Sequence, residues 1–246
     1  MTGPLVSVCM ATYNGGRWID EQLASTLAEL GPDDEVVVVD DASKDDTVAR
    51  VRAFDDPRVR VVVKERNAGY VKAFETALGL AGGEYVLLAD QDDVWEPGRV
   101  AAMVAALGSA EVVASNLSVL GRSDGLRGPY GQHDWRLRAA DSDRRWRNIG
   151  GVLAGNRPYY GSAMGLRRSA LGRVLPFPAY LTETHDLWIA LYGNVARSIR
   201  HLEQTTVRRR VHDSNASPER PRDATAVLRS RLLLLRCLRE LRRRTR

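Results

Sequence analysis

Short apolar runs, each ending in polar or turn-forming residues, alternate with segments of helical spacing over the first 95 residues. The run at 35–39 has four consecutive valines and is typical of a strand buried on both faces. In 17–30, apolar side chains recur every three or four residues, which predicts a helix that ends at Gly31 and Pro32. The same pattern predicts strands over 5–10, 35–39, 59–63 and 85–89, and helices over 17–30, 45–54 and 69–81.

This alternation predicts the fold class. Strands that alternate with helices of about a dozen residues form right-handed βαβ units, so we expect an α/β domain on a largely parallel sheet. The stretch 121–160 has weak periodicity, and we expect irregular structure, short helices and an active-site flap there. Elsewhere beyond residue 95 the pattern predicts helices over 97–107, 184–192 and 224–243, a helical turn at 169–174, and strands over 111–119, 161–166, 195–200 and 205–211.

Polar residues follow four of the predicted strands. In parallel sheets, ligands bind outside the carboxyl ends of the strands, and those ends meet at one edge. We therefore expect four loops to converge on a nucleotide site. These loops are 12–15, 40–43, 67–69 and 90–93.

The loop at 90–93 carries the strongest chemical signal. Asp90, Asp92 and Asp93 directly follow an apolar strand, and carboxylates this close repel unless a cation or hydrogen-bond donors neutralise them. Oxygen ligands of this kind suit Mg²⁺ or Mn²⁺. The alternative interpretation is a polar turn after a strand, where Asp is common. The convergence of the other three loops favours the metal and nucleotide interpretation.

Composition narrows the class of protein. At 246 residues the chain is one large α/β domain or two small ones, with 44% hydrophobic and 27% charged residues, as in soluble globular proteins. No apolar run is long enough to span a bilayer, and the first residues do not resemble a secretory signal. Cys9 and Cys237 indicate no disulfide framework, so we expect a cytoplasmic protein and no glycosylation at 215–217.

Charge is unevenly distributed along the chain. The net charge is +5, but residues 201–246 hold 13 Arg and 5 acidic residues, so the first 200 residues carry −3. A basic tail on an acidic domain does not indicate nucleic-acid binding. The predicted helix at 224–243 has leucines with arginines on its other faces. It is a cover on the core, a dimer element or a helix on anionic lipid at the inner membrane face; the oligomeric state stays open.

Several motifs together resemble the family 2 glycosyltransferases, in order from about residue 5 to residue 217. The resemblance implies a GT-A fold, a Rossmann-like mixed and mainly parallel sheet flanked by helices, with a sugar-nucleotide donor and inversion at the anomeric carbon. The rhamnosyltransferase-like branch is the nearest form, since it shares Gln91 and Trp95. The motifs are Val8–Gly15, Val38–Ser43, Asp90–Trp95, His185–Trp188 and Arg210–Asn215.

The resemblance implies distinct roles within the acidic run. Asp92 binds the metal, Mg²⁺ or Mn²⁺, and Asp90 contacts the ribose or the metal and its waters. His212 reaches the metal or diphosphate from a late loop, which Asn215 holds closed. Asp93 either assists the metal or caps the next helix, and capping is slightly favoured. A metal here would offset the negative charge that builds on the departing nucleoside diphosphate.

The resemblance also implies a donor-binding set. Asp41 matches the residue that reads the nucleobase, and a carboxylate is a strong acceptor for a pyrimidine imide N–H. Thymidine and uridine present the same imide edge, so dTDP-rhamnose is favoured but UDP-hexoses stay open. Tyr13 packs on base or ribose, or only within its loop. The full set expected at the donor is Thr12, Tyr13, Asn14, Asp41, Asn67, Gly69, Asp90 and Gln91.

Asp186 is the candidate general base. An inverting transfer needs a group that takes the proton of the attacking acceptor hydroxyl, and Asp186 matches the family's catalytic carboxylate. The alternative for Asp186 is a helix N-cap. His185 would orient Asp186 or contact the leaving phosphate, while Trp188 stacks on a sugar or belongs to the core. Trp95 joins this acceptor-side set.

We therefore expect a transferase acting on a glycan or lipid-linked acceptor. The domain would span 1–217, with a donor half at 1–95 and an acceptor half at 96–217, followed by a basic segment at 218–246. One alternative is a nucleotidyltransferase, but the loop at 12–15 lacks the Gly-rich basic signature expected of one. Another is a non-catalytic sugar-nucleotide or membrane-binding module, which has no need of a base at Asp186.

Overall fold

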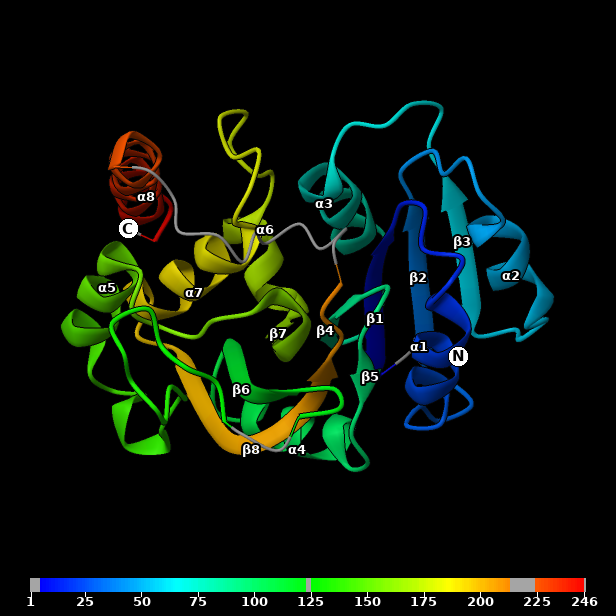
Figure 1. Cartoon of the computed structure of the whole chain (residues 1–246), viewed down its shortest axis with the longest axis horizontal. Helices are drawn as coiled ribbons and strands as arrows, with labels where there is room; N and C mark the ends of the chain where they lie inside the picture. Colours follow the sequence, from blue (N-terminus) through cyan, green and yellow to red (C-terminus); the bar gives the residue numbers. More distant parts are fainter. Residues whose placement is uncertain (1–4, 123–124, 213–223, 246) are drawn as a thin grey trace.

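The computed structural model describes residues 5–122, 125–212 and 224–245. Within these residues one sheet of eight strands has the order β3-β2-β1-β4-β7-β6-β8-β5 (Figure 1). The β1–β2, β2–β3, β1–β4 and β6–β8 pairs are parallel. Strand β7 is antiparallel to β4 and β6, and β5 is antiparallel to β8, so the expected mixed sheet is confirmed. The strands are β1 (Val6–Thr12), β2 (Glu35–Asp40), β3 (Val59–Val63), β4 (Tyr85–Asp90), β5 (Val94–Trp95), β6 (Val112–Val119), β7 (Met164–Arg167) and β8 (Ile199–Arg209).

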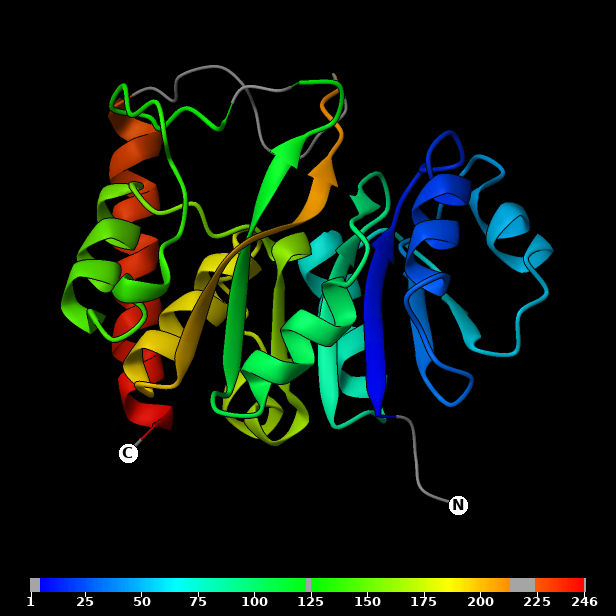
Figure 2. The ribbon, with the colours of Figure 1, turned by 90° about the horizontal axis from the view of Figure 1, so that it is seen from below.

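Helices cover both faces of the sheet (Figures 1 and 2). Side chains alternate along the strands: in β1, Cys9 faces one hydrophobic core and Val8 and Met10 face the other. The core that contains Cys9 is shared by α3, α5, α7 and α8, and the second core by α1, α2 and α4. The helices are α1 (Ile19–Leu27), α2 (Thr47–Ala53), α3 (Tyr70–Leu80), α4 (Arg99–Leu107), α5 (Arg145–Ala154), α6 (Leu171–Val174), α7 (His185–Val195) and α8 (Ala224–Arg244), with 3-10 turns at Ala139–Asp141, Gly161–Ala163 and Arg168–Ala170.

The register of the sheet brings the predicted loops to one edge. Thr12 pairs with Asp40, and Ala11 pairs with Asp90, so β1, β2 and β4 end side by side. Because these strands are parallel, their following loops project from the same edge of the sheet. The predicted convergence of the four polar loops is therefore confirmed for the strand ends that carry three of them.

The late strands differ from the prediction. The two strands expected at 195–200 and 205–211 are one strand, β8, whose pairing with β6 shifts register around Asn116. The Asn116 side-chain amide donates to the carbonyl oxygens of Leu202 and Glu203, both at 3.1 Å, which satisfies backbone groups at the irregularity. Residues 202–204 therefore form a bulged region inside one strand and not a loop between two strands.

The C-terminal helix α8 has two apolar faces. Leu234, Cys237 and Leu241 are buried against the core near α7, α5 and α6. Most of the leucines expected to form its single apolar face lie instead on the outside, because leucines occupy consecutive turns all round this helix. The exposed apolar residues are Val227, Leu228, Leu232 and Leu235. In the described residues, no helix has the length and apolar character that crossing a membrane requires.

Three further expectations concern the domain boundary, the cysteines and the stretch 121–160. The proposed domain boundary at 217/218 lies outside the described residues, and α8 shares a hydrophobic core with the residues before it. Cys9 and Cys237 are both buried and free. In the stretch 121–160, short helices are confirmed by α5 and the 3-10 turn before it, while its role as a flap stays a prediction.

Candidate active site

The acidic run lies where β4 ends and turns into β5. Burial, followed by the charges of Asp93, Asp92 and Asp186, raises the pKa of Asp90 well above its usual range. Burial and the charge of Asp92 raise the pKa of Asp93 to about 6. Clustered carboxylates of this kind favour either a proton or a bound cation. The run is therefore an electrostatically unfavourable group that a positive ligand would stabilise.

A segment from the end of the described domain closes over this run. His212 Nε2 lies 2.7 Å from Asp92 Oδ2, as expected for two residues that act at one place. The His212 ring stacks on Trp18, with 5.1 Å between ring centroids, and Arg210 lies 5.0 Å above the same indole. Asn215, expected to hold this segment closed, lies outside the described residues.

Asp93 does not cap a helix, contrary to the favoured expectation. The next helix, α4, begins at Arg99 after Gly98, so Asp93 is too far away to cap it. Instead, Asp93 Oδ1 accepts the backbone N–H of Arg210 at 3.2 Å, and Arg210 Nε donates to the Asp92 carbonyl oxygen at 3.1 Å. Asp93 therefore joins the acidic run to the segment that carries His212.

A fully buried arginine lies behind the acidic run. Arg99 donates to Thr206 Oγ1 at 2.6 Å, to the Ser162 carbonyl oxygen at 2.6 Å and to the Leu88 carbonyl oxygen at 3.2 Å. Its guanidinium also lies 4.4 Å from the centroid of Trp95. Burial lowers the pKa of Arg99 to about 9 despite the opposing charge of Asp93. This side chain joins β4, β8 and the 3-10 turn at Gly161–Ala163.

The potential metal ligands at this edge of the sheet fit a divalent cation. Asp92 and His212 present an oxygen and a nitrogen ligand side by side, next to two further carboxylates with raised pKa values. Among the described residues, no group of three or more protein ligands is already assembled around one point. Two protein ligands leave the remaining positions for water and phosphate oxygens, which is how metals of this size commonly bind nucleotides.

Asp41 is buried and holds the turn at 67–69. Its carboxylate accepts the Gly69 N–H at 2.7 Å, the Ala68 N–H at 3.0 Å and the Lys64 ammonium at 2.6 Å. Gly69 has φ +87°, a conformation that favours glycine. The Ala68 N–H also reaches the second carboxylate oxygen at 3.1 Å, so these three donors make four contacts with Asp41. The structure thus brings Asp41, Asn67 and Gly69 together as expected.

The first loop is fixed to its neighbours by side-chain hydrogen bonds. Gln91 accepts the Tyr13 N–H at 2.8 Å and donates to the Tyr13 carbonyl oxygen at 3.1 Å. Asn14 Oδ1 accepts the Lys44 N–H at 2.8 Å, and Thr12 Oγ1 donates to Asp40 at 2.9 Å. Thr12, Asn14 and Gln91 therefore organise the loops, while the exposed Tyr13 ring is available for contact with a ligand.

Asp186 lies in the first turn of α7. Thr184 occupies the N-cap position, so Asp186 is not the N-cap residue, although its Oδ1 accepts the Leu187 N–H at 2.8 Å. Burial, with a smaller contribution from Glu183, raises the pKa of Asp186 to about 6. A carboxylate with this pKa is ionised at neutral pH and is a better proton acceptor than an exposed one.

His185 does not hydrogen-bond to Asp186. Its ring stacks on Phe74 at 4.3 Å between centroids and meets the edge of Tyr70 at 5.6 Å. Neither ring nitrogen has a hydrogen-bond partner among the described residues. Burial lowers the pKa of His185 to about 3, so the ring is neutral. His185 therefore does not orient Asp186 by a hydrogen bond, because aromatic packing determines the position of the ring, and its alternative contact with the leaving phosphate stays a prediction.

Two tryptophans belong to the interior and not to an acceptor surface. Trp188 is fully buried, and its indole N–H donates to the Val174 carbonyl oxygen at 3.0 Å. Trp95 is also buried, beside Arg99. Since neither indole face reaches solvent, stacking on an acceptor sugar is excluded for both, and the core interpretation of Trp188 is correct.

Three residues of the site were not identified from the sequence. Trp18, interpreted only as part of a helix, supports His212, and its position directly after the Gly-Gly-Arg turn is the only local signal. Arg209 lowers the pKa values of Asp90 and Asp93 by its charge and lies 5.6 Å from the Tyr160 ring centroid. Tyr160 is near enough to Asp186 for that charge to raise its pKa, after the larger effect of burial.

The family of the protein follows from a match that covers most of the chain. The model of the family described as Glycosyl transferase family 2 matches residues 7–175, which is more than half of the chain. The protein therefore belongs to glycosyl transferase family 2, and the expected GT-A architecture is confirmed by its structural neighbours.

Individual relatives cover different shares of the chain. It is 39% identical over 119 residues to the succinoglycan biosynthesis protein ExoO of Rhizobium meliloti (strain 1021), covering 48% of this chain and 34% of ExoO. The fold is similar to S. aureus TarS 1-349 in complex with UDP-GlcNAc, with TM-score 0.71 and 22% identity over 97% of this chain and 72% of TarS.

A second structural neighbour is glucosyl-3-phosphoglycerate synthase from Mycobacterium tuberculosis in complex with Mn²⁺, UDP and phosphoglyceric acid. Its TM-score is 0.61 and its identity 20%, over 97% of this chain and 78% of the synthase. The chain spans about a third to a half of the length of the curated relatives it matches.

The buried neutral His185 predicts an acid-sensitive contribution to stability. Its folded pKa of about 3 lies below the value of 6.5 expected when unfolded, so this contribution is complete above pH 6.5 and lost as the pH falls toward 3. Between pH 7 and pH 4.5, wild type should lose about 2 kcal/mol more free energy of unfolding than His185→Phe, measured by urea denaturation.

The exposed His133 provides the matched control for that measurement. His133→Gln should follow the wild-type dependence on pH, because it leaves the buried ring of His185 in place. Parallel curves for wild type and His185→Phe would contradict the assignment of a neutral buried ring.

Proposed function

We propose that this protein is an inverting, metal-dependent glycosyltransferase. It transfers a sugar from a nucleoside diphosphate to a hydroxyl group of a glycan or of a lipid-linked acceptor. The observation that carries the proposal is the meeting of an acidic run, Asp90 and Asp92, with a second carboxylate of raised pKa, Asp186, at one sheet edge. Family membership and the name of the relative ExoO, a succinoglycan biosynthesis protein, support this class of reaction.

The donor would be a uridine or thymidine diphosphate sugar. Asp41 matches the family residue that reads the base, and a carboxylate is a strong acceptor for the imide N–H that both bases carry. TarS with UDP-GlcNAc and the synthase with UDP support a uridine donor. Rhamnose stays the sugar favoured by the motif that contains Gln91 and Trp95, and UDP-hexoses are the alternative.

The chemistry of transfer assigns a role to each charged group. Asp186 accepts the proton of the acceptor hydroxyl while that oxygen forms a bond to the anomeric carbon. The bond from that carbon to the diphosphate breaks on the opposite side, and its electron pair leaves with the phosphate. Arg209 and Arg210 would approach the departing anion from the end of β8.

Asp92 and His212 would hold the divalent cation, with Asp90 beside them. A bound cation supplies positive charge that offsets the charge on the departing diphosphate. Because an imidazole nitrogen is a poor ligand for Mg²⁺, this pair favours Mn²⁺ among the two metals expected. The Mn²⁺ and UDP bound by the mycobacterial synthase support a divalent metal.

We also propose that α8 places the enzyme on an anionic membrane surface, at its inner face. The outer face of the helix exposes Leu228, Leu232 and Leu235, while Arg229 and Arg239 are exposed around them. Leucines bordered by arginines suit the interface of an anionic bilayer. Such a location would suit a lipid-linked acceptor.

Asp186→Asn should keep Mn²⁺-dependent binding of UDP but lower the transfer rate by about 10² to 10⁴, because the proton acceptor is lost. In wild type, turnover should rise as the pH increases through about 6, where Asp186 becomes ionised. Glu183→Gln removes an exposed carboxylate three residues away and should retain turnover. Near-normal turnover in Asp186→Asn would refute the base assignment.

Asp92→Ala should abolish the part of UDP binding that depends on Mn²⁺. The substitution removes the carboxylate that lies beside His212 Nε2 and would hold the metal with it. Titration calorimetry with and without Mn²⁺ measures this difference directly. Asp33→Ala is the control, because it removes an exposed carboxylate in the loop before β2. This variant should bind UDP as wild type does. Equal wild-type affinity for UDP under both conditions would rule out the metal role.

The triple variant Leu228→Gln, Leu232→Gln and Leu235→Gln tests the membrane surface. Wild type should sediment with phosphatidylglycerol vesicles and not with phosphatidylcholine vesicles, and the variant should lose this binding because its buried apolar area is gone. If wild type is instead a dimer by light scattering and the variant a monomer, the exposed leucines form a dimer interface and the membrane proposal fails.

A further inference from the structure

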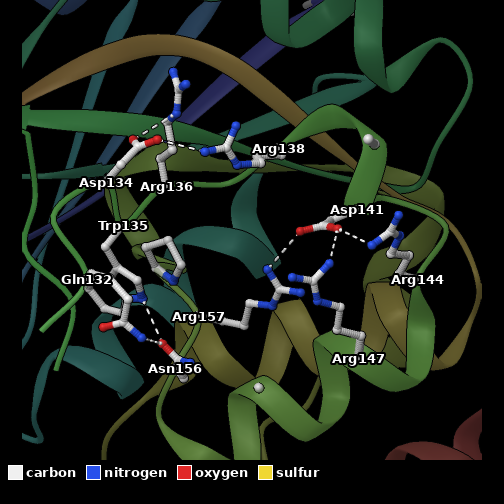
Figure 3. A pocket seen from close by; sticks show the side chains of 13 residues that line it. Gln132, Asp134, Trp135, Arg136, Arg138, Asp141, Arg144, Arg147, Asn156 and Arg157 are labelled. Atoms are coloured by element: carbon white, nitrogen blue, oxygen red, sulfur yellow. Dashed lines mark hydrogen bonds and ion pairs between the residues drawn. The ribbon is translucent and has the colours of Figure 1, made fainter. Parts of the chain in front are cut away.

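A cavity lies away from the acidic run, between the 132–141 segment and α5. Its volume is about 470 Å³, which is in the range of small-molecule sites. Figure 3 shows arginine side chains from the segment and from α5 around this space. The guanidinium groups that line it belong to Arg136, Arg138, Arg144, Arg147 and Arg157.

Two carboxylates only partly neutralise these arginines. Asp141 forms ion pairs with Arg147 at 2.9 Å, with Arg157 at 3.2 Å and with Arg144 at 3.5 Å. Partial burial would raise the pKa of Asp141, but the Arg157 hydrogen bond and the neighbouring guanidinium charges lower it, so Asp141 is ionised.

The second carboxylate, Asp134, pairs with Arg136 at 2.9 Å and with Arg138 at 2.7 Å. Five arginines against two aspartates leave three positive charges in the described lining. The side chains of Arg138, Arg144 and Arg147 are about half exposed, so they are within reach of a ligand from solvent.

The wall of the cavity is connected to the candidate base through Tyr160 and Gly161. Its Trp135 meets the edge of Tyr160, with 6.3 Å between ring centroids. Pro158, which also lines it, is three residues before Gly161, so the two Cα atoms are at most about 10 Å apart. A Cβ at Gly161 would lie 3.6 Å from the Asp186 Cβ, which puts the cavity wall close to the base.

We propose that this arginine-lined cavity binds the diphosphate group of the acceptor. The inference rests on the proposed function, since it concerns the second substrate of that reaction. Arginine forks bind phosphate oxygens in pairs, and a net excess of three positive charges matches a diphosphate better than a single carboxylate.

The position of the cavity agrees with a lipid-linked source of that diphosphate. Helix α5 lines the cavity through Arg147 and Gly151 and also packs against α8, where Arg231 donates to the Ala154 carbonyl oxygen at 2.9 Å. Figure 2 shows α5 and α8 together at one end of the molecule, so cavity and exposed leucines share that end.

The test measures binding of inorganic pyrophosphate and geranyl diphosphate by calorimetry, with EDTA present to prevent metal-dependent binding at the acidic run. Arg144→Gln combined with Arg147→Gln should weaken binding of both probes about tenfold or more, because charge-assisted hydrogen bonds are lost. Arg52→Gln combined with Arg60→Gln, two exposed arginines on α2 and β3 at the opposite end, should bind as wild type does.

Asp134→Asn is a second variant, whose expected effect could not result from damage to the fold. It removes the carboxylate that pairs with Arg136 and Arg138, so it should bind pyrophosphate several-fold more tightly than wild type. Tighter binding of geranyl diphosphate than of pyrophosphate would assign the anion to a lipid-linked acceptor, and the reverse order to a free phosphate compound.

Three results would overturn the inference: absence of binding in wild type, equal affinity in the Arg144 and Arg147 double variant, or tighter binding of glucuronate than of either diphosphate. Binding of UDP with Mn²⁺ is measured on the same protein preparations without EDTA. Loss of cavity binding with normal UDP binding refutes only this inference, while absence of UDP binding in wild type refutes the proposed function.

Discussion

A single buried cation, the guanidinium of Arg99, holds together the part of the sheet on which the acidic run depends. It is fully buried, donates to groups of β4, β8 and the Gly161–Ala163 turn, and contacts Trp95. Burying a charge is costly unless its hydrogen bonds are satisfied, and three of them are satisfied here. Its charge also interacts with that of Asp93. The acidic run therefore lies next to a buried positive charge that links β4, β8 and the Gly161–Ala163 turn.

The site combines residues from both ends of the described domain. The acidic run belongs to the first half of the chain. Arg209 ends β8, the strand that lies beside β6 and pairs with β5, and Arg210 and His212 follow it directly. This strand and the residues after it supply the positive charge that the acidic run lacks. The proposed acceptor cavity has the opposite balance, with arginines in excess. Anionic donor and anionic acceptor would thus be held by different means, the first through a cation and the second through guanidinium groups.

Local patterns were sufficient to predict most of the fold and part of the site. Valine runs and helical spacing located β1 to β4 and their helices, because buried parallel strands have a distinctive composition. The family motifs brought Asp41, Asp90, Asp92 and Asp186 to one edge. The contacts of Trp18 with His212 and of Arg99 with Thr206 were not predictable, since they join positions far apart with no periodic signal. Trp95 and Trp188 show the converse: a motif locates a residue, but only packing tells whether it reaches a ligand.

The contact between Asp92 and His212 joins positions 120 residues apart, and this has a consequence for biosynthesis. A ribosome that has released the first half of the chain presents β1 to β4 with their helices, which can associate early because their contacts are local. The negative charge of the acidic run then lacks the neighbouring arginines until β8 and the residues that follow it leave the ribosome. The nascent protein would therefore gain the proposed cation site only when β8, the last strand of the described residues, docks, so that a partly synthesised chain would have little capacity to bind nucleotide.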